Sequence, residues 1–235
     1  IMMFAQTTRP SVAAYTPPAP QMPPTAQPQQ FAVETQGVTK RYGRQTVVNQ
    51  LNLAVPSGGV YGFLGPNGSG KSTTMKMLLG LAKPTTGEVR VFGRDLRANR
   101  ADILPRIGSL IEGPAFYPHL TGAQNLRIVA DYLSCDKSSI DAVLDIVGLT
   151  DAAGKRARQY SLGMKQRLGI AMALISGPEL LLLDEPTNGL DPAGVAEIRN
   201  LIVQLAHDRG ITVMVSSHLL SEIEQMADIV GIIQS

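Results

Sequence analysis

Apolar residues along this chain of 235 residues fall into short runs of strand length, separated by segments with helical spacing. Leu180 to Leu183 is an unbroken apolar run, which is typical of a strand covered on both faces of a parallel sheet. Strands are also predicted at Val60 to Leu64 and Ile211 to Val215, and a helix at Val195 to Ala206. Buried strands that alternate with helices predict a doubly wound α/β core.

Two segments before this core are rich in β-branched and apolar residues. Phe31 to Val38 and Gln45 to Val55 flank Lys40 to Gly43, a pattern that predicts antiparallel strands joined by a turn. Glu88 to Phe92 predicts another strand. An antiparallel β lobe is therefore expected beside the α/β core.

Residues of about 100–173 have helical character and predict a helical subdomain inserted into the core. Thr121 to Gln124 is a capping-box pattern that begins one helix. Ser139 to Val147 predicts a second helix, and a third is expected to begin at Ser161. A further helix, from Leu219 to Ala227, is expected near the end of the chain.

Residues 1–30 differ in composition, because prolines alternate there with Gln, Ala and Thr. Such a segment buries too little apolar surface to offset the entropy of ordering it, so a disordered tail is expected. A ligand for a proline-recognition domain is the alternative. The folded domain is then expected at residues 31–235.

Composition limits the partners of the chain. The net charge is only +2, and the densest basic cluster, Lys155 to Arg158, is short, so no nucleic-acid partner is expected. No run approaches the roughly 18 apolar residues that cross a bilayer, so membrane contact is expected only through a partner. The single cysteine, Cys135, fits a reducing compartment.

A glycine-rich loop lies between the strand that ends at Leu64 and the helix that begins at Lys71. Its residues are Gly65, Pro66, Asn67, Gly68, Ser69, Gly70, Lys71 and Ser72. Backbone N–H groups can surround phosphate oxygens only where side chains do not intrude, which explains the three glycines. Lys71 would add a positive charge for the β and γ phosphates, and Ser72 a hydroxyl for Mg²⁺. The loop predicts binding of a nucleoside triphosphate, with a flexible surface loop as the weaker alternative.

Two carboxylates follow the apolar run at the carboxyl end of the sheet, where doubly wound folds place their ligands. Asp184 is expected to hold Mg²⁺, and Glu185 to orient and deprotonate the water that attacks the γ phosphate. Acidic pairs also cap helices, and the glycine-rich loop is what favours the catalytic interpretation. His218 follows a core strand at the same edge and would hydrogen-bond the γ phosphate; a structural histidine is the alternative.

The order and spacing of these segments resemble the nucleotide-binding subunit of ATP-binding cassette (ABC) transporters, from Phe31 to the C-terminus. Gly65 to Ser72 matches the Walker A motif, and Leu180 to Glu185 matches Walker B. Tyr160 to Arg167 stands in the place of the family signature, and Gly189 to Asp191 resembles the D-loop. The resemblance implies a P-loop NTPase fold and binding of ATP with Mg²⁺.

The resemblance implies further nucleotide contacts. Tyr42 looks like the aromatic residue that stacks on adenine, Thr73 extends the phosphate loop, and His218 is similar to the switch histidine. Ser161, a good helix N-cap, and Gly163 would face the γ phosphate held by a second copy. A homodimer, or a paired cassette, is therefore expected on ATP binding. Its expected place is the cytoplasmic face of the cell membrane, on a separate transmembrane permease.

Two departures from the family pattern stand out. Leu162 and Met164 replace a glycine and a glutamine of the signature. Glu112 lies in the loop after a strand at Ile107 and Gly108, where family members usually carry glutamine, so a carboxylate is expected near Mg²⁺ as a metal ligand. Ile111 to Pro118 together with Tyr160 to Met164 resembles the bacitracin and lantibiotic export or self-immunity branch.

The function implied by the resemblance is an ATP-hydrolysing subunit that powers export of a peptide antibiotic, drug or lipid-like substrate. A soluble ABC-type ATPase acting on nucleic acid or ribosomes is the alternative from another class. Chromosome and repair versions separate Walker A from the signature by long coiled coils, whereas residues 72–161 hold only a small lobe, and ribosome-associated versions carry two cassettes. A catalytically silent module is a third possibility, against which Lys71, Asp184 and Glu185 argue. Family members generally continue beyond the position of Ser235, so a further C-terminal segment is expected.

Overall fold

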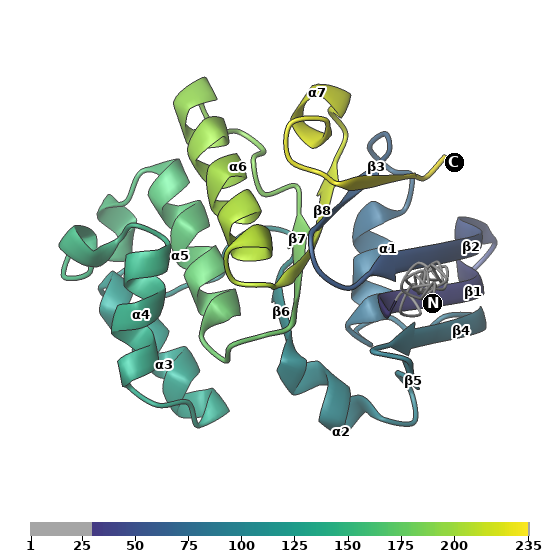
Figure 1. The fold of residues 1–235 in the computed structure, drawn as a ribbon, viewed down its shortest axis with the longest axis horizontal. Helices are drawn as coiled ribbons and strands as arrows, with labels where there is room; N and C mark the ends of the chain where they lie inside the picture. The colour runs from purple at the N-terminus through teal and green to yellow at the C-terminus, as the bar shows by residue number, and fades with distance from the viewer. Residues whose placement is uncertain (1–29, 235) are drawn as a thin grey trace, which may run out of the picture.

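The computed structural model describes residues 30–234, and its strands form two sheets, one antiparallel and one parallel (Figure 1). The antiparallel sheet has the order β2-β1-β4-β5, with β1 (Phe31–Tyr42), β2 (Gln45–Pro56), β4 (Thr86–Val91) and β5 (Arg94–Asp95). The parallel sheet has the order β6-β7-β8-β3-β9, with β3 (Val60–Leu64), β6 (Ile107–Leu110), β7 (Leu180–Asp184), β8 (Thr212–Ser217) and β9 (Ile229–Ile232). The predicted α/β core with an antiparallel lobe is confirmed. The tail predicted at residues 1–30 lies almost wholly outside the described residues.

Strand β7 explains why the apolar core has two parts. Alternate side chains of a strand point to opposite faces of its sheet. Leu181 and Leu183 join one buried cluster with α5 (Leu162–Leu174) and α6 (Pro192–His207). Leu180 and Leu182 join a second cluster with α1 (Lys71–Leu78) and the antiparallel sheet. Every residue of β7 is buried, which is why the apolar run in the sequence is unbroken.

The helical side of the molecule carries α3 (Gly122–Leu133), α4 (Ser138–Ile146) and α5. The predicted capping box is present, because the Thr121 hydroxyl accepts from the Gln124 N–H at 3.1 Å and the Gln124 side chain accepts from the Thr121 N–H at 2.9 Å. None of the helices in residues 30–234 has the length and apolar character needed to cross a bilayer.

Two expected elements differ from the structure. The segment of about 100–173 is not wholly helical, because after the short α2 (Arg100–Ile103) it contains β6, which pairs with β7 in the core sheet. The helix expected from Leu219 to Ala227 is only α7 (Leu220–Ile223). The chain turns after α7 because β9 must return to pair with β3.

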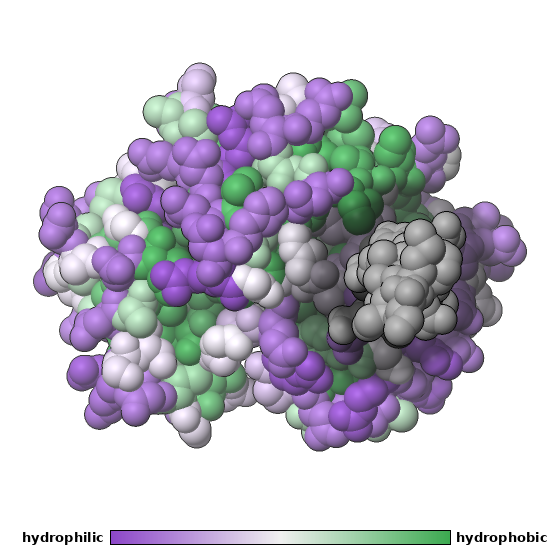
Figure 2. Space-filling view, in the orientation of Figure 1, coloured by the Kyte–Doolittle hydropathy of each residue, from purple (hydrophilic) through white to green (hydrophobic). Residues whose placement is uncertain are grey.

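The C-terminal part of the described chain forms the edge of the parallel sheet beside β3. Apolar side chains gather around α7 and β9 on the face seen in Figure 2, and those with large exposure are Leu219, Leu220, Ile229, Val230 and Ile232. The next residue, Ile233, packs against Gly65 at the start of the glycine-rich loop. This apolar edge therefore adjoins the loop directly.

Asp228 fixes the start of β3, the strand that leads to the loop. Its carboxylate accepts from the Val60 N–H at 2.7 Å and lies 3.1 Å from His207 Nε2. The Val60 hydrogen bond and, less strongly, His207 hold the pKa of Asp228 below its ordinary value. Because the folded pKa is lowered, the stabilisation is present above the ordinary pKa of about 4 and is lost as the pH falls through the folded value.

We therefore expect Asp228→Asn to lower Tm at pH 7 by about 2–4 °C or less, since this carboxylate is half exposed. The difference from the wild type should shrink as the pH falls below about 4 and through the lowered pKa of Asp228 in the folded protein. Thermal unfolding followed by circular dichroism at both pH values measures it. Asp208→Asn is the control, because that exposed carboxylate at the end of α6 forms no hydrogen bond within residues 30–234. A difference of the same size at both pH values would contradict the assignment.

Candidate phosphate-binding site

The glycine-rich loop leaves the carboxyl end of β3 and leads into α1. Gly70 is the N-cap of α1 with φ of 98°, a conformation that favours glycine. A Cβ on Gly70 would lie 2.8 Å from the Val47 carbonyl oxygen, and one on Gly65 would lie 2.6 Å from the Ile233 carbonyl oxygen. Packing against the surrounding backbone therefore requires glycine at both positions.

The loop, the first turn of α1 and one catalytic candidate enclose a common space. A pocket of about 200 Å³ is lined by Val47, Asn67, Gly68, Gly70, Lys71, Ser72, Thr73 and Glu185. The N–H groups of Asn67, Gly68 and Gly70 donate to no acceptor within residues 30–234. The first N–H groups of α1 also lack intrahelical acceptors, as at any helix N-terminus. Free N–H donors around a lysine fit a phosphate chain.

Two buried hydroxyls beside the pocket have no partner within the described residues. Ser69 is 3% exposed and Thr74 is 1% exposed, and neither side-chain oxygen forms a hydrogen bond. Buried hydroxyls are normally paired. Ser69 belongs to the loop itself, so its free hydroxyl adds to the donors available there. The role predicted for Pro66 and Ser69 in nucleotide binding stays a prediction.

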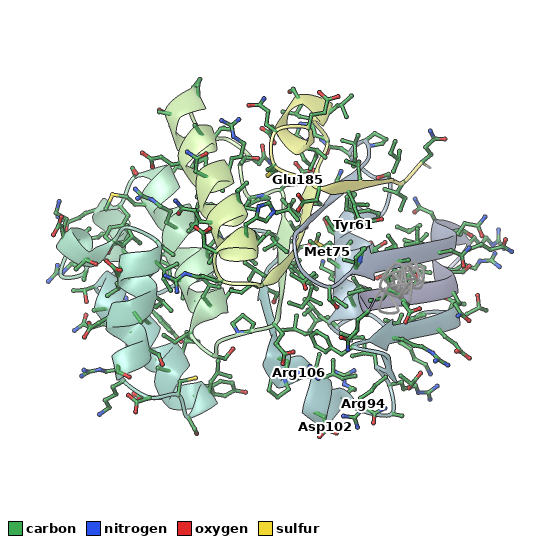
Figure 3. All side chains as sticks on the ribbon, in the orientation of Figure 1. Tyr61, Met75, Arg94, Asp102, Arg106 and Glu185 are labelled. Atoms are coloured by element: carbon green, nitrogen blue, oxygen red, sulfur yellow. The ribbon has the colours of Figure 1, made fainter. Side chains whose placement is uncertain are left out.

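The structure brings the three predicted catalytic residues into direct contact. Lys71, whose side chain is 5% exposed, places Nζ 2.6 Å from the Gly65 carbonyl oxygen and 3.1 Å from Glu185 Oε1. The other oxygen of Glu185 lies 2.7 Å from His218 Nδ1. A buried ammonium requires a counter-charge, and Glu185 supplies it. Figure 3 shows Glu185 beyond the end of β7, close to α7.

Asp184 and Glu185 are held by a serine that was not predicted. The Ser216 hydroxyl, fully buried at the end of β8, donates to Asp184 Oδ1 at 2.7 Å and accepts from the Glu185 N–H at 3.0 Å. Glu185 has φ of 49°, which is uncommon for a residue with a side chain. Ser216 therefore stabilises the unusual turn that presents Glu185 to Lys71. In the sequence, Ser216 could have been found as a hydroxyl directly after the apolar run that ends at Val215, two residues before His218.

Among residues 30–234, no group of three or more His, Cys, Asp and Glu side chains is arranged to hold a metal ion. The Mg²⁺ predicted for Ser72 and Asp184 would rely on a hydroxyl, one carboxylate and phosphate oxygens, which is the usual environment of Mg²⁺ beside a nucleotide. The pairing of Ser72 and Asp184 as ligands stays a prediction.

Glu112 forms an ion pair with Lys76 of α1. The hydrogen bond to Glu112 is the main reason that the pKa of Lys76 is raised. The negative charge of Asp184 also raises the Lys76 pKa, to a smaller extent. The role of Glu112 as a metal ligand stays a prediction.

Tyr42 is the last residue of β1, and the residue is 52% exposed. The ammonium of Lys40 lies 4.6 Å from the ring centroid, close enough for a cation–π contact. Val47, in the paired strand β2, lines the phosphate pocket, so the β1–β2 hairpin lies beside the loop. This position suits an aromatic ring that stacks on a base, and the adenine contact stays a prediction.

Ser161 and Gly163 lie at the start of α5, in the helical part of the molecule. The Ser161 hydroxyl accepts from the Met164 N–H at 3.2 Å, which confirms the predicted N-cap. A Cβ on Gly163 would meet no atom within 4 Å, so this surface is open. Within residues 30–234, no hydrogen bond or ion pair joins either residue to Lys71 or Glu185. Their predicted contact with a second copy stays a prediction.

A glycine-rich loop between a parallel strand and a helix, with carboxylates at the end of the neighbouring sheet, defines a P-loop nucleotide-binding domain. Residues 48–188 match the family model described as ABC transporter. The chain belongs to this family.

Curated relatives carry transport names. Bacitracin transport ATP-binding protein BcrA of Enterococcus faecalis is 52% identical over 204 residues, which cover 86% of this chain and 66% of the relative. BcrA of Bacillus licheniformis is 55% identical over 202 residues, with the same coverage of both chains. Lantibiotic transport ATP-binding protein SrtF of Streptococcus pyogenes is 46% identical over 201 residues, 86% of each chain. This chain thus spans 66% of the length of the two BcrA relatives.

Solved structures share the fold. CbiO1 from Clostridium perfringens, described as part of the ABC transporter complex cbiONQ, has a TM-score of 0.80 and 26% identity over 88% of this chain and 86% of that one. The ATP-binding cassette MJ0796, described as a dimer in a post-hydrolysis state bound to ADP and Pi, has a TM-score of 0.76 and 26% identity over 86% of this chain and 94% of that one.

Proposed function

We propose that this chain is the ATP-binding and ATP-hydrolysing subunit of an export-type ABC transporter. The observation that carries the proposal is the direct contact of Lys71 with Glu185, and of Glu185 with His218, beside the free N–H groups of the glycine-rich loop. A phosphate-binding surface and a general base thus lie in one pocket.

Each residue of the pocket has a separate role in the proposed ATP hydrolysis. The loop N–H groups and Lys71 bind the phosphate chain, and Lys71 exchanges its contact with Glu185 for the phosphates. Glu185 then accepts the proton of the attacking water, and His218 keeps the carboxylate oriented through its 2.7 Å contact. Ser72 and Asp184 would hold Mg²⁺, which would supply positive charge to neutralise the phosphates.

The active assembly is a dimer in which Ser161 and Gly163 of one copy face the γ phosphate held by the other. Supporting this, the N-terminus of α5 is open to solvent and separate from the pocket of its own chain. A helix N-terminus with a free first turn is an anion site. The related cassette MJ0796 is described as dimeric.

A prediction follows for the purified chain. ATP turnover per chain should rise with protein concentration, because each complete site needs two copies, whereas ATP should still bind at the lowest concentrations, where the chain is a monomer. Turnover and nucleotide titration over a hundredfold range of protein concentration measure both. Turnover per chain that stays constant over the range, with a monomer shown by light scattering, would contradict the dimer.

The cargo class and the partner come from the relatives. BcrA and SrtF are named for transport of bacitracin and lantibiotics, so we infer a peptide antibiotic as cargo, moved through a separate transmembrane permease. The chain would then lie at the cytoplasmic face of the membrane, in contact with that permease. Drugs and lipid-like molecules are the other cargo classes consistent with this proposal.

The transport function is tested by comparing how a membrane partner and how nucleic acid stimulate ATP turnover. The full chain is co-expressed with the membrane protein encoded beside it, and ATP turnover is measured in proteoliposomes with and without bacitracin or a lantibiotic. We expect copurification and at least a severalfold stimulation by the peptide. Stimulation by RNA, DNA or ribosomes without membranes, and none by the membrane protein, would overturn the proposal.

A further inference from the structure

A carboxylate outside the pocket joins the two segments that carry Glu185 and His218. Glu222 Oε2, in α7, accepts from the Thr187 hydroxyl at 2.7 Å and from the Ser217 hydroxyl at 3.0 Å. Thr187 lies two residues after Glu185, and Ser217 lies directly before His218. One oxygen atom therefore connects both segments.

Both hydroxyls are deeply buried. Thr187 is 4% exposed and Ser217 is 1% exposed. Buried hydroxyls without an acceptor are costly, and a carboxylate makes a stronger acceptor than a neutral group. Within residues 30–234, Glu222 is the acceptor of both.

Ser217 connects this junction to the rest of the pocket. Its hydroxyl accepts from the Leu219 N–H at 3.0 Å, so the backbone on both sides of His218 is fixed. Its carbonyl oxygen accepts from the Gly65 N–H at 3.2 Å, at the start of the glycine-rich loop. A shift of Ser217 would therefore move His218 relative to Glu185 and to the loop.

We propose that Glu222 is a positioning residue for ATP hydrolysis, which sets the Glu185–His218 contact by binding the segments of both residues through one oxygen. The inference rests on the proposed ATP hydrolysis. Glu222 is not among the pocket-lining residues, so it acts through Thr187 and Ser217. The fully buried Ile223 packs α7 against the core, so α7 has an attachment that does not depend on the Glu222 carboxylate.

Three variants separate positioning from stability. Glu222→Ala removes the acceptor, Glu222→Gln keeps an oxygen that can accept both hydrogen bonds, and Glu224→Ala removes an exposed carboxylate two residues away in the sequence that forms no hydrogen bond within residues 30–234. Glu222→Ala should lower kcat by roughly 10- to 100-fold, the effect of a displacement of about 1 Å at a catalytic site. The affinity for ATP should change by less than about twofold, because the loop is intact. Glu222→Gln should restore most of the turnover, and Glu224→Ala should leave it unchanged.

Hydrogen exchange of Glu222→Ala and a second variant, Ser217→Ala, extend the test. Hydrogen exchange should accelerate in residues 185–190 and 217–219 of Glu222→Ala, with the exchange of β7 unchanged. If Glu222→Ala fails to fold, Ser217→Ala replaces it, with the same expected loss of kcat and no added loss when combined with Glu222→Gln.

The outcomes are distinguishable. Wild-type kcat in a folded Glu222→Ala, or in Ser217→Ala where the former does not fold, would overturn this inference while the proposed function stands. An equal loss of kcat in Glu224→Ala would show that Glu222 only stabilises α7. Faster hydrogen exchange in Glu222→Ala with unchanged kcat would show the same. A wild-type chain that binds but never hydrolyses ATP, alone or in membranes, would refute the proposed function and this inference with it.

Discussion

Lys71→Ala is expected to weaken ATP binding by roughly 10- to 100-fold, the usual worth of a hydrogen bond to a charged group. The ammonium is 5% exposed and is surrounded by the Gly65 and Pro66 carbonyl oxygens and Glu185, so no other cation can replace it locally. Titration with a fluorescent ATP analogue at constant Mg²⁺ measures the change.

The matched control is Lys137→Ala, because Lys137 is exposed in the helical part of the chain. It has the same charge change and should leave affinity unaltered. Lys71→Arg should not restore binding fully, since a planar guanidinium does not occupy the place of a compact ammonium. Wild-type affinity in Lys71→Ala, with an unchanged Tm, would mean that the phosphates bind elsewhere.

Glu185→Gln is expected to slow ATP turnover by roughly 10²–10⁴, the contribution of a general base. ATP binding should persist and become no weaker, because glutamine cannot form the ion pair that holds Lys71 at 3.1 Å. Steady-state turnover and nucleotide titration of the same preparation separate the two effects.

Glu224→Gln provides the control for loss of a carboxylate, since Glu224 is exposed on the surface near α7. Turnover that survives in Glu185→Gln would remove Glu185 from its catalytic role. His218, whose Nδ1 lies 2.7 Å from Glu185, would then be the next candidate for the proton acceptor.

Local patterns in the sequence predicted much of the fold. Leu180 to Leu183 identified a strand buried on both faces, because each leucine faces one of the two apolar clusters. The capping box at Thr121 predicted the start of α3, because all its hydrogen bonds lie within four residues. Strand β6 was identified only in part, at Ile107 and Gly108 beside the family's glutamine position, because four residues are too few to show a period.

The main residues of the site were also predictable, whereas their supports were not. Lys71 and Glu185 belong to motifs with recognisable chemistry. The bonds of Ser216 with Asp184 and Glu185, and the bond of Glu222 with Thr187, span more than 30 residues, so only the three-dimensional fold reveals these partners. The pairing of Glu112 with Lys76 was missed for the same reason, since it joins residues 36 positions apart.

The ion pair between Lys71 and Glu185 couples phosphate binding to release of the Glu185 carboxylate. Under the proposed function, Lys71 and Glu185 stay paired until phosphate oxygens compete for the ammonium, and only then is the carboxylate free. The Glu185 carboxylate therefore becomes available as a base only when an anion occupies the pocket that it shares with Lys71.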